Sequence, residues 1–295
     1  KFRREVEMSK MILTGAIMAV VMAVAAYGED PTGARVVRKT CRSADGVEIV
    51  YSVAGTGEPA LVFIHGGLAN RGFWDGQLKA FGPRHRTIAL DLAGHGESGR
   101  NRLTWGMPEF GADVKAVVDA EKARKVILFG NSLGGPVAVE AALLMPERVL
   151  GVVGVDTFQA FSQRIPAEDL RQRAELFEKD YPGALKTMVG MLFHKDADPA
   201  IVADAEKRMA GTSPAVAKAM FLSMAGYEEA AAVRRLKAPM RAINGDLYPT
   251  DIQANRKIKP DFDAVIMKHM GHYPMLERPD EFNRLIAKAV ASLTK

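Results

Sequence analysis

The sequence of 295 residues contains a single cysteine, Cys41, which excludes an internal disulfide. No cluster of cysteine and histidine has the spacing of a zinc site. The formal net charge is only +5, and no basic run is interleaved with aromatic residues, so we expect no nucleic-acid partner. Apolar residues make up 48% of the chain and charged residues 25%, which excludes a disordered, collagen-like or polytopic membrane protein. Function must therefore be inferred from motifs.

The first thirty residues differ in composition from the rest of the chain. Basic residues in the first ten positions precede an uncharged stretch at 11–26, which ends in small residues around Ala23 and Ala25. This pattern predicts a signal peptide within 1–30, and hence export to the periplasm or outside the cell. Sixteen helical residues would span about 24 Å, short of a hydrocarbon core of about 30 Å. The alternatives are a core helix or an uncleaved anchor, in a cytoplasmic or membrane-anchored protein.

From Cys41 onward, short apolar runs alternate with stretches of helical spacing. Strands are predicted at 47–53, 61–64, 87–91, 125–129, 149–155, 240–243 and 264–267, and helices at 108–121, 133–145 and 279–293. Apolar strands alternating with helices predict a mostly parallel sheet covered on both faces. No strand is predicted in 157–236, where the pattern predicts several helices. We therefore expect an α/β core formed by 31–156 and 237–295, with a helical insertion at 157–236.

The most informative motif runs from Gly130 to Gly134 and has the pattern Gly-x-Ser-x-Gly. It follows an apolar strand and directly precedes a helix. A sharp strand-to-helix turn of this kind exposes a serine hydroxyl above a helix N-terminus. Ser132 is therefore the candidate nucleophile. The alternative is an ordinary turn in which the serine only caps the helix.

Four motifs in order resemble those of serine hydrolases with the α/β-hydrolase fold, over about residues 41–295. Besides the serine motif they are His65-Gly66-Gly67 with Trp74, the loop at 91–98 with the pattern Asp-x-x-Gly-x-Gly-x-Ser, and Gly271-His272. The resemblance implies that the amides of Gly67 and Leu133 form an oxyanion hole. A flexible turn is the alternative role for Gly66-Gly67.

The resemblance also implies that His272 is the general base, because this histidine follows the last predicted strand. His269, three residues earlier, lies nearer the strand end. His65 and His95 belong to loop motifs in which the family uses histidine structurally.

The sequence departs from the family at the third catalytic residue, the acid that orients the general base in a Ser-His-Asp triad. Most relatives carry it in a Gly-x-x-Asp pattern, but Tyr248 stands at that position here. A tyrosine, with an ordinary pKa near 10, cannot replace a carboxylate. Asp156, at the end of a strand beside the serine motif, is the preferred acid, and Asp246 is the alternative. Asp251 is more typical of a helix cap.

The predicted insertion is rich in flexible apolar side chains that suit an apolar acyl or alkyl group. The alternative is that they only pack the helices together. They are Met188, Met191, Leu192, Phe193, Met209, Met220, Phe221 and Met224.

We expect hydrolysis of a carboxylic ester or similar small acyl substrate through an acyl-enzyme, with no metal or organic cofactor. The alternatives are an amidase, lactonase, aminopeptidase or carbon–carbon bond hydrolase, or a binding protein that lacks turnover.

Overall fold

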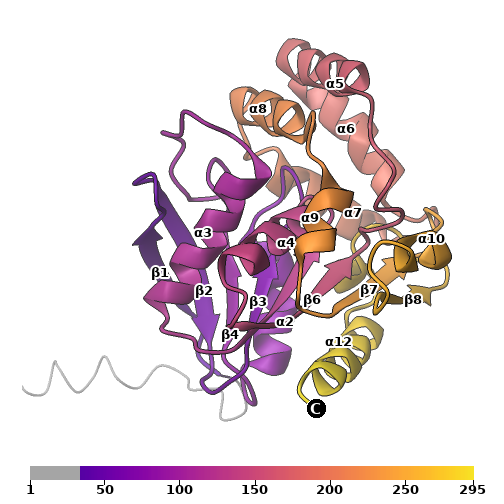
Figure 1. The fold of residues 1–295 in the computed structure, drawn as a ribbon. Helices are drawn as coiled ribbons and strands as arrows, with labels where there is room; N and C mark the ends of the chain where they lie inside the picture. The colour runs from indigo at the N-terminus through magenta and orange to yellow at the C-terminus, as the bar shows by residue number, and fades with distance from the viewer. Residues whose placement is uncertain (1–33) are drawn as a thin grey trace, which may run out of the picture. The chain divides into compact units, whose positions relative to one another are not determined.

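The computed structural model describes residues 34–295, which contain one sheet with helices on both faces (Figure 1). The strand order is β1-β2-β4-β3-β5-β6-β7-β8. β2 pairs antiparallel with β1 and with β4, and all other neighbours are parallel. The strands are β1 (Val37–Arg42), β2 (Glu48–Ala54), β3 (Ala60–Ile64), β4 (Thr87–Leu90), β5 (Val126–Asn131), β6 (Val149–Val155), β7 (Met240–Gly245) and β8 (Asp263–Met267). The predicted α/β-hydrolase fold is confirmed.

Helices cover the two faces in pairs. α3 (Met107–Ala120) and α4 (Gly134–Leu144) pack against each other on one face, and α2 (Asp75–Phe81) contacts α12 (Pro279–Leu293) on the other. α12 buries Phe282, Ile286 and Val290 at spacings of four, which is the stripe that an amphipathic helix turns toward a core. The short elements η1 (Arg71–Trp74), α10 (Ile252–Arg256) and α11 (Pro274–Glu277) complete the core.

The observed strands and helices lie close to the predicted ones. β6 and α12 have the predicted bounds, and the other predicted elements agree within one or two residues. β1 is not predicted by the pattern, because this edge strand pairs only with β2 and five of its six side chains are exposed. A strand without a buried face shows little alternation of apolar and polar residues.

Between β6 and β7 the chain forms a run of helices, which we call the inserted helices. α5, α6 and α8 lie together at one end of the fold in Figure 1. The capping residues Asp198 and Ser213 precede proline at the starts of α7 and α8 and accept amides of the first turn. The inserted helices are α5 (Ala167–Lys179), α6 (Tyr181–Leu192), α7 (Pro199–Met209), α8 (Pro214–Met224) and α9 (Glu229–Arg235).

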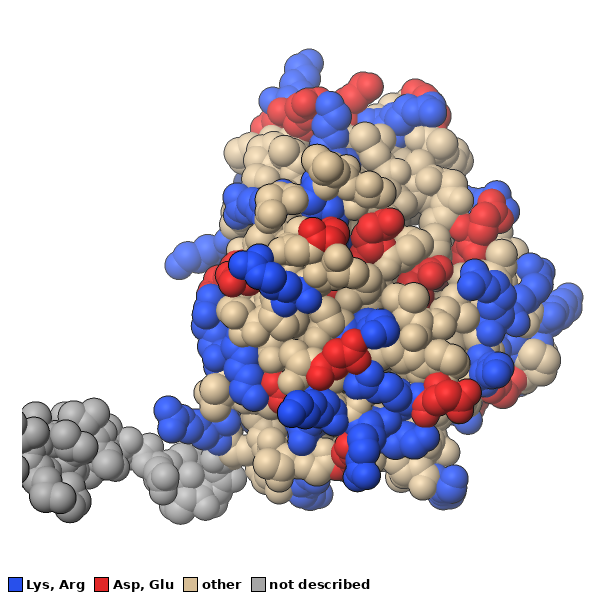
Figure 2. All heavy atoms as spheres, turned by 60° about the vertical axis from the view of Figure 1, so that its left-hand side comes forward, with Lys and Arg blue, Asp and Glu red and all other residues tan. Residues whose placement is uncertain are grey.

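The surface of the described residues is mixed in charge. On the face in Figure 2, acidic side chains lie among the basic ones, which gather toward the lower end of the view. Across residues 34–295, no helix combines the length and apolar character needed to span a bilayer. The signal peptide predicted in 1–30 lies outside the described residues.

Candidate active site

Ser132 occupies the turn between β5 and α4. Its φ of +51° lies in the left-handed region, which costs a non-glycine residue about 1–3 kcal/mol. The turn is tight, because a Cβ on Gly130 would lie 2.1 Å from the carbonyl oxygen of Gly134. The serine amide donates to the carbonyl of Val155 at 3.2 Å, which ties the turn to the end of β6. The Ser132 side chain is thus held at the carboxyl end of the sheet by a strained backbone.

His272 and Asp156 are in direct contact. Asp156 follows β6, is 1% exposed, and accepts Nδ1–H of His272 at 2.5 Å through Oδ2. Its Oδ1 accepts the amide of Gly245 at 2.9 Å. Because the carboxylate occupies Nδ1, the neutral imidazole presents the lone pair of Nε2. This tautomer is the one that can accept a proton.

Asp246, the alternative acid, contacts the backbone of the histidine loop. Its side chain is exposed, and its Oδ1 accepts the amide of Met270 at 3.1 Å. Hydrogen bonds from the amides of Met270 and His269 lower the pKa of Asp246. Tyr248 donates its hydroxyl to the carbonyl of Met191 at 3.0 Å. The structure therefore brings Asp156, and not the alternative Asp246, to His272.

A side chain within the serine motif connects the serine turn to the histidine loop. Nδ2 of Asn131 donates to the carbonyl of His272 at 3.0 Å and to that of Val155 at 2.9 Å. In residues 34–295 no hydrogen bond joins Ser132 Oγ directly to the His272 ring. Such contacts are often long in unliganded enzymes and tighten when substrate binds. Asn131 was missed in the sequence, where it is only the variable residue before the serine.

The amides of Gly67 and Leu133 lie in the two loops that meet at Ser132. Within the described part of the chain, neither N–H donates to an acceptor. A Cβ on Gly66 would lie 3.2 Å from the Ser132 Cβ, and one on Gly67 would lie 4.0 Å from Leu133 Cδ2. Two unengaged donors beside the hydroxyl can stabilise a developing oxyanion.

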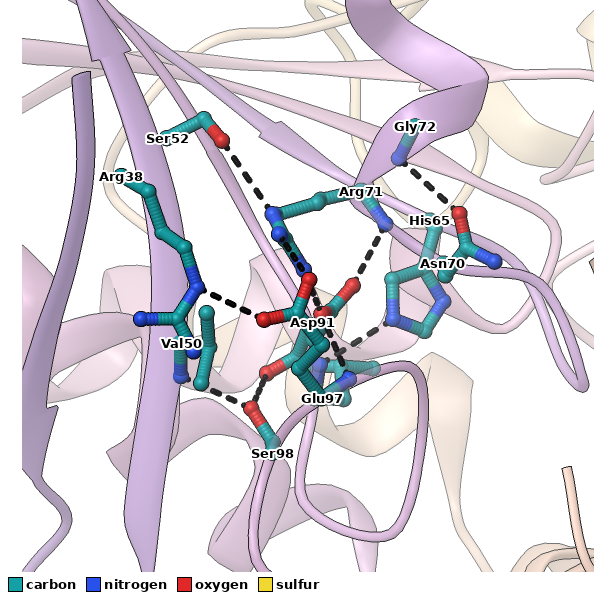
Figure 3. Close-up of polar contacts among 11 residues, drawn as sticks. Arg38, Val50, Ser52, His65, Asn70, Arg71, Gly72, Asp91, Glu97 and Ser98 are labelled. Carbon is teal, nitrogen blue, oxygen red and sulfur yellow. Dashed lines mark hydrogen bonds and ion pairs between the residues drawn. The ribbon is translucent and has the colours of Figure 1, made fainter. Parts of the chain in front are cut away.

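A network of charged groups holds the loop that carries Gly67 (Figure 3). Arg71 donates its backbone amide to Oδ1 of Asp91 at 2.7 Å, and its guanidinium pairs with the same carboxylate. The guanidinium also pairs with Glu97 at 2.6 Å, and Arg38 binds Glu97 from the edge strand β1. Asp91 is fully buried, so its charge requires this partner. The network fixes the Gly67 loop against the loop after β4.

The two buried histidines of these loops are held neutral. His65 accepts the amide of Leu92 at Nε2, and burial lowers its pKa to about 4. Burial lowers the pKa of His95 to about 3, and the two rings lie 5.1 Å apart. Their structural contacts match the role that the family resemblance implies.

The space beside the free amides is apolar. A Cβ on Gly67 would lie 2.6 Å from Sδ of Met220, a buried residue of α8. Tyr273 packs on the His272 ring and on Phe193, which follows α6. The described residues contain no group of three or more possible metal ligands. The arrangement suits proton transfer and nucleophilic attack on an uncharged group.

Comparison with known proteins identifies relatives across most of the chain. The model of the family described as alpha/beta hydrolase matches residues 61–285. A pimeloyl-[acyl-carrier protein] methyl ester esterase of Nitrosomonas europaea is 28% identical over 76% of this chain and 92% of its own length. The dihydrolipoyllysine-residue acetyltransferase component of an acetoin cleaving system from Pseudomonas putida is 25% identical over 79% of this chain.

Coverage of the relatives varies. The chain spans 64% of the Pseudomonas protein, and 38% of an Azorhizobium caulinodans relative that is 35% identical over 102 residues. Among solved structures, a thermophilic esterase from Thermogutta terrifontis superposes with a TM-score of 0.75 at 22% identity, covering 89% of this chain and 100% of that one. This similarity is one of fold.

Proposed function

This chain belongs to the alpha/beta hydrolase family, and on that premise we propose that it is a serine hydrolase that cleaves a carboxylic ester or a similar small acyl substrate. Ser132, His272 and Asp156 form the triad, and the amides of Gly67 and Leu133 form the oxyanion hole. The inserted helices, within 157–236, act as a cap over these groups. The observation that supports the proposal most directly is the Asp156–His272 hydrogen bond beside the strained serine turn.

The acylation step follows from this geometry. Nε2 of His272 accepts the proton of Ser132 Oγ as the oxygen attacks the ester carbonyl, and Asp156 stabilises the imidazolium. The carbonyl oxygen gains negative charge, which the two free amides stabilise; one such donor contributes about 2.7–4 kcal/mol. Collapse of the intermediate breaks the bond to the leaving alkoxide, which takes the proton from Nε2. The product is an alcohol and an acyl group on Ser132.

Deacylation repeats these steps with water as the nucleophile. Nε2 of His272 removes a proton from the attacking water, and the new tetrahedral intermediate uses the same two amides. When the acyl–oxygen bond breaks, Ser132 Oγ regains the proton and a carboxylic acid leaves. The triad returns to its starting protonation state, so no co-reactant besides water is required.

An uncharged, apolar acyl or alkyl group suits the surroundings best. Met220 lies against the amide loop, Tyr273 packs on the imidazole ring, and Phe193 packs on Tyr273. A buried charge facing these side chains would lack a partner. The Nitrosomonas relative named as a methyl ester esterase is consistent with an ester substrate.

The direct test is hydrolysis of p-nitrophenyl esters of graded acyl length by the wild-type protein and by Ser132→Ala. We expect turnover by the wild type, strongest for uncharged acyl groups, and none above background for Ser132→Ala with unchanged circular dichroism. Turnover retained by the Ser132→Ala variant would exclude Ser132 as the nucleophile. Amide and lactone substrates measured in parallel distinguish the remaining hydrolase classes.

A further inference from the structure

The loop that carries His272 is held almost entirely through its backbone amides. Every N–H from residue 269 to 273 meets an acceptor. Asp246 accepts those of His269 and Met270, Glu277 accepts those of Gly271 and Tyr273 at 3.3 Å each, and the Leu192 carbonyl accepts that of His272 at 2.7 Å. A loop outside regular structure is thus fixed by two carboxylates and one carbonyl.

Glu277 differs from the other acceptors because its contacts lie on both sides of His272 along the backbone. Its Oε2 accepts the amide before His272, and its Oε1 accepts the amide after it. Glu277 therefore holds the backbone on both sides of His272, while the Leu192 carbonyl and Asn131 hold the amide and carbonyl of His272 itself.

The same carboxylate reaches the inserted helices. The amide of His194, just beyond α6, lies near Glu277 and is one of the groups that lower its pKa. A Cβ on Gly271 would lie 2.6 Å from that amide nitrogen and 2.7 Å from Oε1 of Glu277. Together with the Leu192 carbonyl, this contact connects the end of α6 directly to the histidine loop.

Within residues 34–295, N–H groups rather than a cation hold the carboxylate. Glu277 is half-buried, and burial raises its pKa while the surrounding amides lower it. Each loop bond to Glu277 is 3.3 Å long and so weaker than a short charge-assisted hydrogen bond, but the two act together on either side of His272. Such an arrangement fixes position more closely than an exposed ion pair would.

We propose that Glu277 is a positioning residue for His272, which holds the loop of the general base and couples it to the end of α6. This inference rests on the proposed function of His272. The simpler role for Glu277 is to cap the short α11, which would affect stability alone. Loss of positioning instead lowers kcat, since a displacement of about 1 Å at a catalytic group can cost about 100-fold.

The test uses Glu277→Gln, with Asp280→Asn as the matched control. Glutamine keeps the size of the side chain but turns an NH2 group toward an amide N–H, so one contact becomes repulsive. Asp280 is exposed at the start of α12 and makes no hydrogen bond to the histidine loop. We expect kcat of Glu277→Gln to fall about 10- to 100-fold with KM changed less than about threefold. Asp280→Asn should retain wild-type values.

A second readout is independent of turnover. In protein labelled at histidine, we expect the His272 ring resonances to move in Glu277→Gln, and the amides of Gly271 and Tyr273 to exchange faster with solvent. A wild-type protein without esterase activity would reject the proposed function, yet these signals would still report on positioning. Unchanged His272 resonances and exchange rates would overturn the inference, as would a kcat within twofold of wild type.

Discussion

Replacement of Asp156 by asparagine tests which carboxylate orients the base. In the wild type both carboxylate oxygens accept N–H groups, at 2.9 Å from Gly245 and 2.5 Å from His272 Nδ1. Asparagine has one acceptor oxygen. If that oxygen keeps Gly245, the NH2 group faces Nδ1, and the ring must carry its proton on Nε2, where it cannot accept the proton of Ser132.

The expected loss is large. The corresponding substitution in a serine protease lowers kcat about 10⁴-fold, which is about 5.4 kcal/mol of transition-state stabilisation. We expect a loss of about 10³- to 10⁴-fold in steady-state hydrolysis of a p-nitrophenyl ester by Asp156→Asn. Asp246→Asn should lose less than about tenfold, because Asp246 is exposed and contacts only loop amides. A larger loss in Asp246→Asn than in Asp156→Asn would refute this assignment.

Three further predictions concern stability and selectivity. In the folded protein the pKa of His65 is lowered to about 4 and that of His95 to about 3. Below about pH 6.5 the unfolded chain therefore binds more protons than the folded protein does. The stability that is present at pH 7 is lost as pH falls. Urea unfolding at pH 5 should show a loss of about 2 kcal/mol for each histidine, and an unchanged midpoint would contradict their neutral burial. Arg71→Leu should lower the free energy of unfolding by about 3–5 kcal/mol, because it leaves the buried carboxylate of Asp91 without its partner. Arg38→Leu removes an exposed member of the same network and should cost less than about 0.5 kcal/mol. Equal losses in the two variants would argue against the network. Met220→Ala should shift the preferred p-nitrophenyl ester toward longer acyl chains, and an unchanged profile would place the acyl group elsewhere.

The core of the fold was predictable because its strands are buried on both faces. β3 and β6 consist of apolar residues bounded by turn residues, and their ends fall within a residue of the predicted ones. The edge strand β1 was not predictable in this way. Its pairing with β2 depends on a partner several residues away, and its exposed side chains carry no period.

The arrangement of the site depends on contacts that a linear pattern does not contain. The motif identifies Ser132 because strand, turn and helix follow one another in sequence. The choice between Asp156 and Asp246 requires knowing which carboxylate faces the His272 ring across neighbouring strands. The role proposed for Glu277 is not visible in a linear pattern either, since it depends on how the histidine loop folds around the carboxylate beside the end of α6.

The measurement that tests the central claim most directly is covalent labelling by a fluorophosphonate, followed by peptide mapping. The reagent reacts only with a serine whose proton is removed by a nearby base and whose oxyanion is stabilised. We predict one modified peptide, carrying the label on Ser132, in the wild type, and slow or absent labelling in His272→Ala. Intact wild-type protein after prolonged exposure, or labelling of equal rate in His272→Ala, would contradict the account.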